Sequence, residues 1–219
     1  MIATISADIV RSTSMNTEDL IVLRNKLQGL FHDLEEDYPG FWARIVRGDS
    51  IECVVPNYND ALRIAILIKL YIKMRVSEFE CSKMLQKYGI RFSIGVAEIK
   101  YADKKEDIIN GAAIYISGRN LDEISRKDNI MTAFEIEQVP KPLSNLLNSY
   151  VAMVSGLIDS YSAKQAEVIY MKLRGLKEKE ISESVGIYQS SVNTRATNAK
   201  WNLLNTAIKD YEALKIEQI

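Results

Sequence analysis

The sequence has little of what zinc sites and disulfides require. Its 219 residues contain one histidine, His32, and two cysteines, Cys53 and Cys81, with no CxxC pair. Because a zinc site needs several Cys or His ligands at close spacing, this composition argues against one. Both cysteines are expected to be reduced thiols, as in cytoplasmic proteins.

The sequence also lacks an excess of charge and long apolar runs. It has 28 Lys and Arg against 29 Asp and Glu, a formal net charge of −1. The overall charge therefore favours neither nucleic acid nor membrane as a partner. No apolar run reaches the roughly 18 residues of a membrane-spanning helix, and the first residues lack the basic start of a signal peptide. These absences predict a cytoplasmic protein.

Two periodicities are present, and the pattern changes near residue 139. Before that point, alternating strand patterns are interleaved with helical spacing. The strand patterns cover residues 1–9, 41–55, 90–99 and 129–134. Residues 41–55 read as two strands around a Gly48-Asp49 turn, so the order is β-α-β-β-α-β-α-β. This order predicts an α+β, ferredoxin-like sheet domain with helices on one face and the other face open to a ligand or a second subunit.

The segment after residue 139 shows helical patterns only. Gly175 and Gly186 lie where its helices should break. The expected helices are a linking helix and three further helices at 163–173, 177–184 and 188–215. We therefore divide the chain into a sheet domain over 1–139, a linker helix over 140–160 and an all-α domain over 161–219.

The all-α segment contains a short helix, a turn at Gly186 and a helix that begins with polar residues. This is the helix-turn-helix arrangement, whose second helix enters the major groove of DNA. Polar side chains at the start of that helix can bond base edges and phosphates. The candidate DNA-binding residues are Lys177, Tyr188, Gln189, Ser190, Ser191, Asn193, Thr194, Arg195 and Asn198.

The segment from Ala163 to Arg195 resembles the helix-turn-helix of sigma factor region four and of LuxR-type regulators. The matching elements are the leading helix, LKEKEIS ahead of VGI, and SSV followed by Arg195. The resemblance implies double-stranded DNA as the partner.

A helical dimerisation hairpin is the alternative for these helices. From Ala163 onward the chain has 9 Lys and Arg against 7 Asp and Glu. A weakly basic monomer would bind DNA poorly, because affinity grows with the number of phosphate contacts. A homodimer presenting two such helices would bind better. The apolar residues that could form its seam lie in the last helix: Trp201, Leu203, Leu204, Ile208 and Leu214.

Two carboxylates in the sheet domain suggest a metal site. Asp8 ends the first strand, and Asp49 lies at the tip of the following hairpin. If these strands are neighbours the carboxylates could converge, and carboxylates without histidine suit Mg²⁺ or Mn²⁺. Two such ions can clamp a triphosphate. Ordinary turn chemistry is the alternative for Asp49.

Residues 1–134 resemble the class III nucleotidyl cyclase domain. The motifs that carry the resemblance are ADIVRST, the Gly48-Asp49 hairpin, IRFSIGVAEI and GAAIYISGR. The resemblance implies a cyclase-like fold, with metal ions held at Asp8, Ile9 and Asp49. If the protein is an enzyme, the resemblance also implies that Arg119 stabilises the charge that develops on the phosphates. The candidate ligand-binding residues are Arg11, Ser12, Thr13, Arg47 and Arg119.

Three positions depart from the cyclase pattern. They are Ile45, in place of a purine-reading lysine; Tyr115, in place of an asparagine; and Ile108, in place of the aspartate that pairs with the lysine. Arg44 or Arg47 could replace the lysine only with a changed geometry, and Asp107 lies one residue from the aspartate position. Nucleotide or metal binding without turnover therefore fits better than a purine cyclase of the usual mechanism.

The layout of the whole chain resembles the SatD-like family of bacterial regulators. The resemblance rests on Ala7-Asp8-Ile9, Arg47-Gly48-Asp49-Ser50 and Ser117-Gly118-Arg119, followed by the helix-turn-helix. Together these patterns predict a cytoplasmic, homodimeric DNA-binding transcriptional regulator whose sheet domain senses a ligand such as a nucleotide with Mg²⁺. The alternatives are a divergent nucleotidyl cyclase or nucleotidyltransferase using Asp8 and Asp49, and a protein-interaction module.

Overall fold

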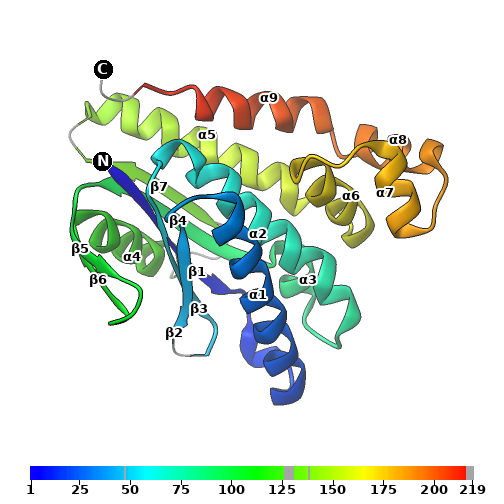
Figure 1. Ribbon diagram of the computed structural model, residues 1–219, viewed down its shortest axis with the longest axis horizontal. Helices are drawn as coiled ribbons and strands as arrows, with labels where there is room; N and C mark the ends of the chain where they lie inside the picture. Colours follow the sequence, from blue (N-terminus) through cyan, green and yellow to red (C-terminus); the bar gives the residue numbers. More distant parts are fainter. Residues whose placement is uncertain (47, 126–130, 138, 216–219) are drawn as a thin grey trace.

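The computed structural model describes residues 1–46, 48–125, 131–137 and 139–215. Its centre is a five-stranded sheet in the order β2-β3-β1-β4-β7 (Figure 1). The strands are β1 (Ile2–Ile9), β2 (Trp42–Val46), β3 (Ser50–Val55), β4 (Ile90–Ala97) and β7 (Thr132–Ile136). Neighbouring strands are antiparallel, except that β4 and β7 are parallel. The α+β class is therefore confirmed. The strand predicted at 129–134 falls partly outside the described residues.

Helices surround this sheet and continue beyond it. They are α1 (Thr17–Asp37), α2 (Ala61–Arg75), α3 (Lys83–Tyr88), α4 (Ala112–Ser125), α5 (Lys141–Asp159), α6 (Ala163–Leu173), α7 (Glu178–Val185), α8 (Gln189–Asn198) and α9 (Trp201–Glu212). A small hairpin of β5 (Ile99–Asp103) and β6 (Ile108–Gly111) precedes α4. The sequence patterns predicted neither this hairpin nor α3. None of the described helices is long and apolar enough to cross a membrane.

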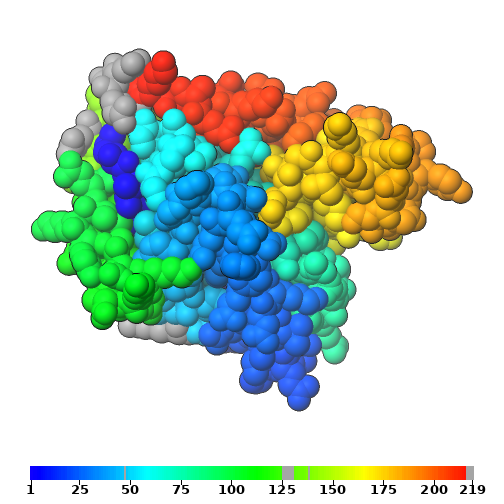
Figure 2. Space-filling model, in the orientation of Figure 1, coloured from blue at the N-terminus to red at the C-terminus, as the bar shows by residue number. Residues whose placement is uncertain are grey.

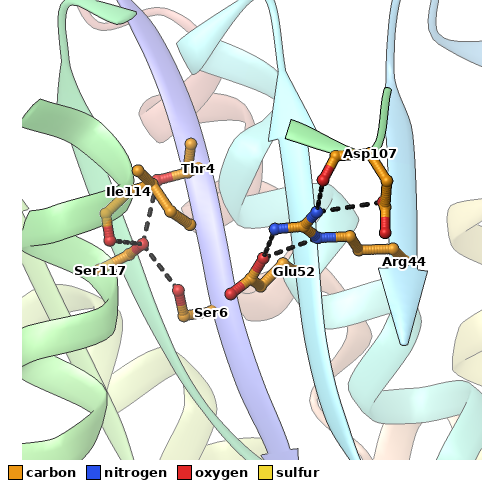
Figure 3. A network of polar contacts seen from close by, with 7 residues as sticks. All are labelled: Thr4, Ser6, Arg44, Glu52, Asp107, Ile114 and Ser117. Atoms are coloured by element: carbon orange, nitrogen blue, oxygen red, sulfur yellow. Dashed lines mark hydrogen bonds and ion pairs between the residues drawn. The ribbon is translucent and has the colours of Figure 1, made fainter. Parts of the chain in front are cut away.

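The helices lie on both faces of the sheet, so the prediction of helices on one face is wrong. In β1 the apolar side chains of Ala3, Ile5 and Ala7 are buried on the side of α1 and α2. The alternate residues Thr4 and Ser6 face α4 on the other side (Figures 1 and 3). The face expected to be open is therefore partly covered by α4.

Small side chains allow α4 to pack closely on the sheet. Gly95 of β4 lies under the helix, where an added Cβ would come within 2.5 Å of the Ala113 carbonyl oxygen. The Ser117 hydroxyl of α4 lies 3.0 Å from that of Thr4 and 2.8 Å from that of Ser6 (Figure 3). These hydrogen bonds satisfy buried polar groups that an apolar helix would leave unpaired.

The nearly all-apolar helix α2 is buried, as its sequence predicts. It lies between the sheet and the C-terminal helices, and α6 packs along it. One hydrophobic core runs from β1 through α2 to Ile208 and Tyr211 of α9. The Tyr211 hydroxyl also donates to the Tyr58 carbonyl at 3.2 Å. The sheet and the C-terminal helices thus share a core, and the domain boundaries remain a prediction.

Two lysines of α2 are buried where α2 meets α3 and the end of α5. Lys69 Nζ donates to the carbonyls of Tyr88, at 2.8 Å, and Ile90, at 3.0 Å. It also lies 2.8 Å from a carboxylate oxygen of Asp159, the last residue of α5. Lys73 Nζ donates to the Asp159 carbonyl at 3.2 Å and to the last carbonyls of α3. This cluster joins α5 to the helical layer over the sheet.

Lys73 makes the stability depend on pH. Burial lowers the pKa of Lys73 from 10.5 to about 8; the charge of Lys69 adds to this, and Asp159 opposes it. Between these values the unfolded chain binds more protons than the native one, so stability rises with pH. From pH 8 to 9.5 we expect wild type to gain up to about 2 kcal/mol relative to Lys73→Met. Urea unfolding of both proteins at pH 7.5, 8.5 and 9.5 checks this, and parallel pH profiles would contradict it.

The predicted helix over 188–215 is two helices, so that boundary is wrong. Lys200 has a φ of 56°, in the left-handed region that ends a helix, while Ala199 before it is fully buried. The break turns α9 back along α5 (Figure 1). Leu204 and Ile208 consequently point into the core of the same chain and cannot form the predicted dimer seam, whereas Leu203 is exposed.

Candidate functional site

The predicted carboxylates lie at the same end of the sheet. Asp8 of β1 pairs with Ser50 of β3, next to Asp49. The Ile9 amide donates to the Asp49 carbonyl at 3.2 Å, which docks the hairpin tip against the end of β1. The Ile9 side chain is buried in the core, so this residue offers only its backbone to a ligand.

Each carboxylate has a partner within the chain. Asp8 accepts a hydrogen bond from Arg91 Nε at 2.6 Å, and Asp49 accepts one from the Ser12 hydroxyl at 2.5 Å. Burial raises the pKa of Asp8, Arg91 opposes this, and the charges of Asp49 and Asp122 add to it. Asp8 and Asp49 are thus close enough to repel one another, which is how neighbouring acids raise a carboxyl pKa.

The other ligand candidates near β1 differ in accessibility. Ser12 is buried in the 3₁₀ turn Ser12–Ser14, whereas Arg11 and Thr13 are exposed. Arg11 has a φ of 55°, so the chain turns sharply straight after β1. Arg47 lies outside the described residues.

Arg119 does not join the two aspartates within the chain. Its side chain is 59% exposed, and its guanidinium lies 3.1 Å from the carboxylate of Glu135 on β7. Glu135 is level with Gly95, and Gly95 with Thr4, four residues from Asp8 along β1. Four residues span about 13 Å of strand. Any joint action of Arg119 and Asp8 on one ligand would therefore require a second subunit or a long ligand.

Arg44 connects the turn of the β5–β6 hairpin to strands β2 and β3 (Figure 3). Arg44 of β2 donates to Glu52 of β3 from Nε at 2.8 Å and from a terminal nitrogen at 2.6 Å. Its other terminal nitrogen lies 3.0 Å from the carboxylate of Asp107 and donates to the Asp107 carbonyl. Arg44 lies next to Ile45, and Asp107 lies next to Ile108. These are the two positions at which the cyclase pattern has a lysine and its partner aspartate.

Glu52 is not among the residues that the sequence patterns indicate. The signal was present, because Arg44 and Glu52 face each other across the β2–β3 hairpin as a cross-strand pair of opposite charge. The Glu135 partner of Arg119 was also missed. It could not have been predicted, because it depends on the parallel pairing of β7 with β4 and on the position of α4.

The C-terminal candidates are mostly exposed along α8. α7 ends at Gly186, which has a φ of 69°, and α8 starts at Gln189. Val192 and Ala196 of α8 are buried, and α8 packs against α6 and α7. The exposed candidates are Lys177, Tyr188, Gln189, Ser190, Asn193, Thr194 and Asn198. Ser191 is half-buried.

Arg195 points back toward the protein. Its side chain is 22% exposed, with one terminal nitrogen 4.0 Å from the carboxylate of Glu167 on α6. The same nitrogen has no hydrogen-bond partner among the described residues. That nitrogen is also buried, so the Arg195 side chain would have to turn outward before it could contact an external acceptor.

Negative charge is missing from α8 and its surroundings in sequence. No Asp or Glu occurs between Glu183 and Asp210, while Arg195, Lys200 and Lys209 lie in this interval. α7 does contain acidic residues, and its glutamates Glu178 and Glu183 lie near Lys172 and Lys179.

In Figure 2 the helices α6 to α8 form the yellow and orange projection at one end of the molecule. α8 thus lies on a projecting part of the surface.

Comparisons with known proteins give a partial likeness in fold. No family model matches the chain, and no curated protein matches it. A structure of a bacterial light-regulated adenylyl cyclase has a TM-score of 0.42 and 18% identity, over 61% of this chain and 74% of that one. A second structure of such a cyclase has a TM-score of 0.44 and 16% identity, over 61% of this chain and 42% of that one. At this level the likeness carries no conclusion about function.

Proposed function

We propose that the chain is a DNA-binding regulator, with α8 as the helix that contacts double-stranded DNA. The observation that carries the proposal is the division of α8 into two faces. Val192 and Ala196 fix one face on α6 and α7, while Gln189, Asn193 and their exposed neighbours form the other. The short α7, the left-handed Gly186 turn and α8 follow one another as a helix-turn-helix requires.

The exposed face of α8 has the chemistry for reading a major groove. The amide groups of Gln189 and Asn193 suit the paired donor and acceptor of adenine. The hydroxyls of Ser190 and Thr194 suit phosphates or bases. Tyr188, at the N-cap, makes no side-chain cap hydrogen bond within the described structure. The first backbone amides of α8 therefore receive no hydrogen bond acceptor from the N-cap side chain. Such amides bind phosphate oxygens.

A dimer would supply the positive charge that one chain lacks. The C-terminal segment from Ala163 has an excess of two positive charges, so a monomer would make few phosphate contacts.

In such a dimer, binding of a ligand to the sheet could alter the spacing of the two α8 helices. By linkage, DNA would change the affinity for the ligand by the same factor. If ligand titration leaves the DNA affinity unchanged, this coupling is wrong.

A single charge on α8 tests the DNA proposal. Gln189→Glu places a carboxylate at the exposed start of α8, where it would repel phosphates. We expect it to weaken duplex binding about tenfold or more. Gln28→Glu, the same change on the exposed side of α1, should leave binding unchanged. Fluorescence anisotropy with a labelled duplex between 50 and 200 mM salt measures both. Equal affinities for the two variants, or binding insensitive to salt as in a protein-interaction module, would contradict the proposal.

The Asp8–Asp49 pair favours a second function, binding of a divalent cation with a nucleotide. The charge of Asp49 adds to the burial that raises the pKa of Asp8, and a cation would relieve that repulsion. Arg91 already offsets part of the charge, and the described residues contain no cluster of three or more acidic, Cys or His ligands. The two carboxylates would therefore hold the ion with help from the nucleotide phosphates.

An assay of catalysis tests the enzymatic alternative. The protein is incubated with each nucleoside triphosphate and Mn²⁺, and cyclic and linear products are measured. A regulator should give none. Product that disappears in Asp8→Ala would instead support the divergent cyclase or nucleotidyltransferase.

A further inference from the structure

The outer surface of α5 carries no charge although much of it is exposed. The 17 residues between Lys141 and Asp159 include no Asp, Glu, Lys or Arg. Within this stretch the side chains of Leu146 and Met153 are largely exposed, Met153 at 68%. A helix that faces water normally carries charged residues on its exposed side. Exposed apolar side chains that gather into a larger patch mark an interaction site.

α9 extends this surface. It runs antiparallel to α5, because Tyr150 meets Ala207 while Leu157 lies near Leu203 (Figure 1). The Tyr150 hydroxyl donates to the Ala207 carbonyl at 2.5 Å. An apolar groove of about 460 Å³ lies between the two helices. Leu203 on its border is 63% exposed.

The exposed and half-buried residues follow the spacing of a helix seam. On α5 the residues Leu146, Tyr150, Met153 and Leu157 recur at intervals of four, three and four. Along α9 the interval is three, four and three, through Lys200, Leu203, Ala207 and Asp210. This is the spacing by which helices pack side by side in bundles. The other ridge of α9, with Leu204 and Ile208, is already used by the chain's own core.

The row of α9 side chains from Lys200 to Asp210 carries opposite charges at its two ends. Lys200 precedes α9 at the end beside Leu157, and Asp210 lies at the other end, where its charge adds to the burial that raises the pKa of Tyr150. A twofold interface must be complementary to itself, and where the helices of the two copies pack antiparallel, each end of one copy meets the opposite end of the other. Lys200 would thus meet Asp210 of the second copy.

We propose that this groove is a homodimer interface, in which the α5–α9 pair of one chain packs antiparallel on that of a second copy. α5, with 19 residues, is about 28 Å long, and two packed helices are about 20 Å wide. The resulting face of roughly 550 Å² approaches the ~800 Å² per partner of stable complexes once flanking side chains are added. The proposal does not depend on DNA binding, although it would supply the dimer that the proposed function needs.

Charged substitutions in the seam test the interface. Analytical ultracentrifugation of the full chain from 1 to 100 µM should show a dimer for wild type. Met153→Glu and Leu203→Glu should be monomeric, with unchanged circular dichroism. Ile21→Glu, a matched change on the exposed face of α1, should remain dimeric. A monomeric wild type at 100 µM, or a dimer that survives Met153→Glu, would overturn the proposal.

A charge exchange tests the antiparallel arrangement without introducing charge into the apolar seam. Lys200→Glu and Asp210→Lys should each raise the dimer dissociation constant about tenfold or more, since like charges then meet. The double variant should restore the wild-type value. If the double variant is as weak as the single ones, the two residues do not meet across the interface. A dimer that fails to bind DNA would contradict the DNA proposal alone.

Discussion

Gly95→Ala is expected to lower the free energy of unfolding by about 2–3 kcal/mol. The added Cβ would lie 2.5 Å from the Ala113 carbonyl oxygen and 2.8 Å from the Ser117 amide nitrogen. Both are backbone atoms of α4, so no side-chain rotation can relieve the clash and the whole helix must move. Overpacking of this kind costs about 1–3 kcal/mol, occasionally more. The displacement would also move Arg119 relative to Glu135.

Gly118→Ala in the same helix is the matched control. Nothing lies within 4 Å of an added Cβ at Gly118, and alanine is the better helix former. This variant should be neutral or more stable by up to about 1 kcal/mol. Urea unfolding of the three proteins measures the difference. Equal stability of Gly95→Ala and wild type would show that α4 does not pack on β4 as described.

Asp159→Ala is expected to have the largest effect on stability, a loss of about 3–5 kcal/mol. Lys69 is fully buried, and Asp159 is its acidic partner at 2.8 Å. Removing one member of a buried pair leaves an uncompensated charge in a medium of low dielectric constant. Burial already lowers the pKa of Lys69, and loss of Asp159 would lower it further.

A double variant separates the charge from packing effects. Lys69→Met combined with Asp159→Ala removes both charges and should recover much of the stability lost in Asp159→Ala alone. Chemical unfolding of the two single variants and the double variant gives the coupling free energy between the positions. If the two single losses simply add, the pair is not coupled as its geometry indicates.

The parts of the fold that the sequence predicted are those that periodicity determines locally. The β2–β3 hairpin follows from alternation around Gly48-Asp49, and the burial of α2 follows from its apolar composition. The succession of α6, α7 and α8 follows from the glycine positions and the polar start of α8. In each case neighbouring residues carry the whole signal.

The features that were predicted wrongly or not at all depend on contacts between distant segments. The position of α4 on the far face depends on Gly95 fitting beneath Ala113 and Ser117, and glycine in a strand does not reveal its neighbour. The break at Lys200 depends on the burial of Ala199 against other helices. For the same reason the pairings of Arg119 and Arg195 could not be predicted, since both partners lie on other elements.

The candidate site was predicted in part. The sequence placed Asp8 and Asp49 near each other because they end adjacent strands, and the structure has them at one end of the sheet. It did not predict that Arg91 and Ser12 would bind these carboxylates. Arg91 is directly opposite Asp8 on β4, a pairing that requires knowing which strands are neighbours.

The central claim is that the exposed face of α8 reads double-stranded DNA. Its most direct test is selection of duplexes from a random-sequence pool by wild type and by Asn193→Ala. Wild type should enrich one motif, with two half-sites if the protein is a dimer. Asn193→Ala should lose the preference for adenine at one position of each half-site, which is worth about 1–3 kcal/mol. No enriched motif, or the same motif with the same preferences for both proteins, would contradict the claim.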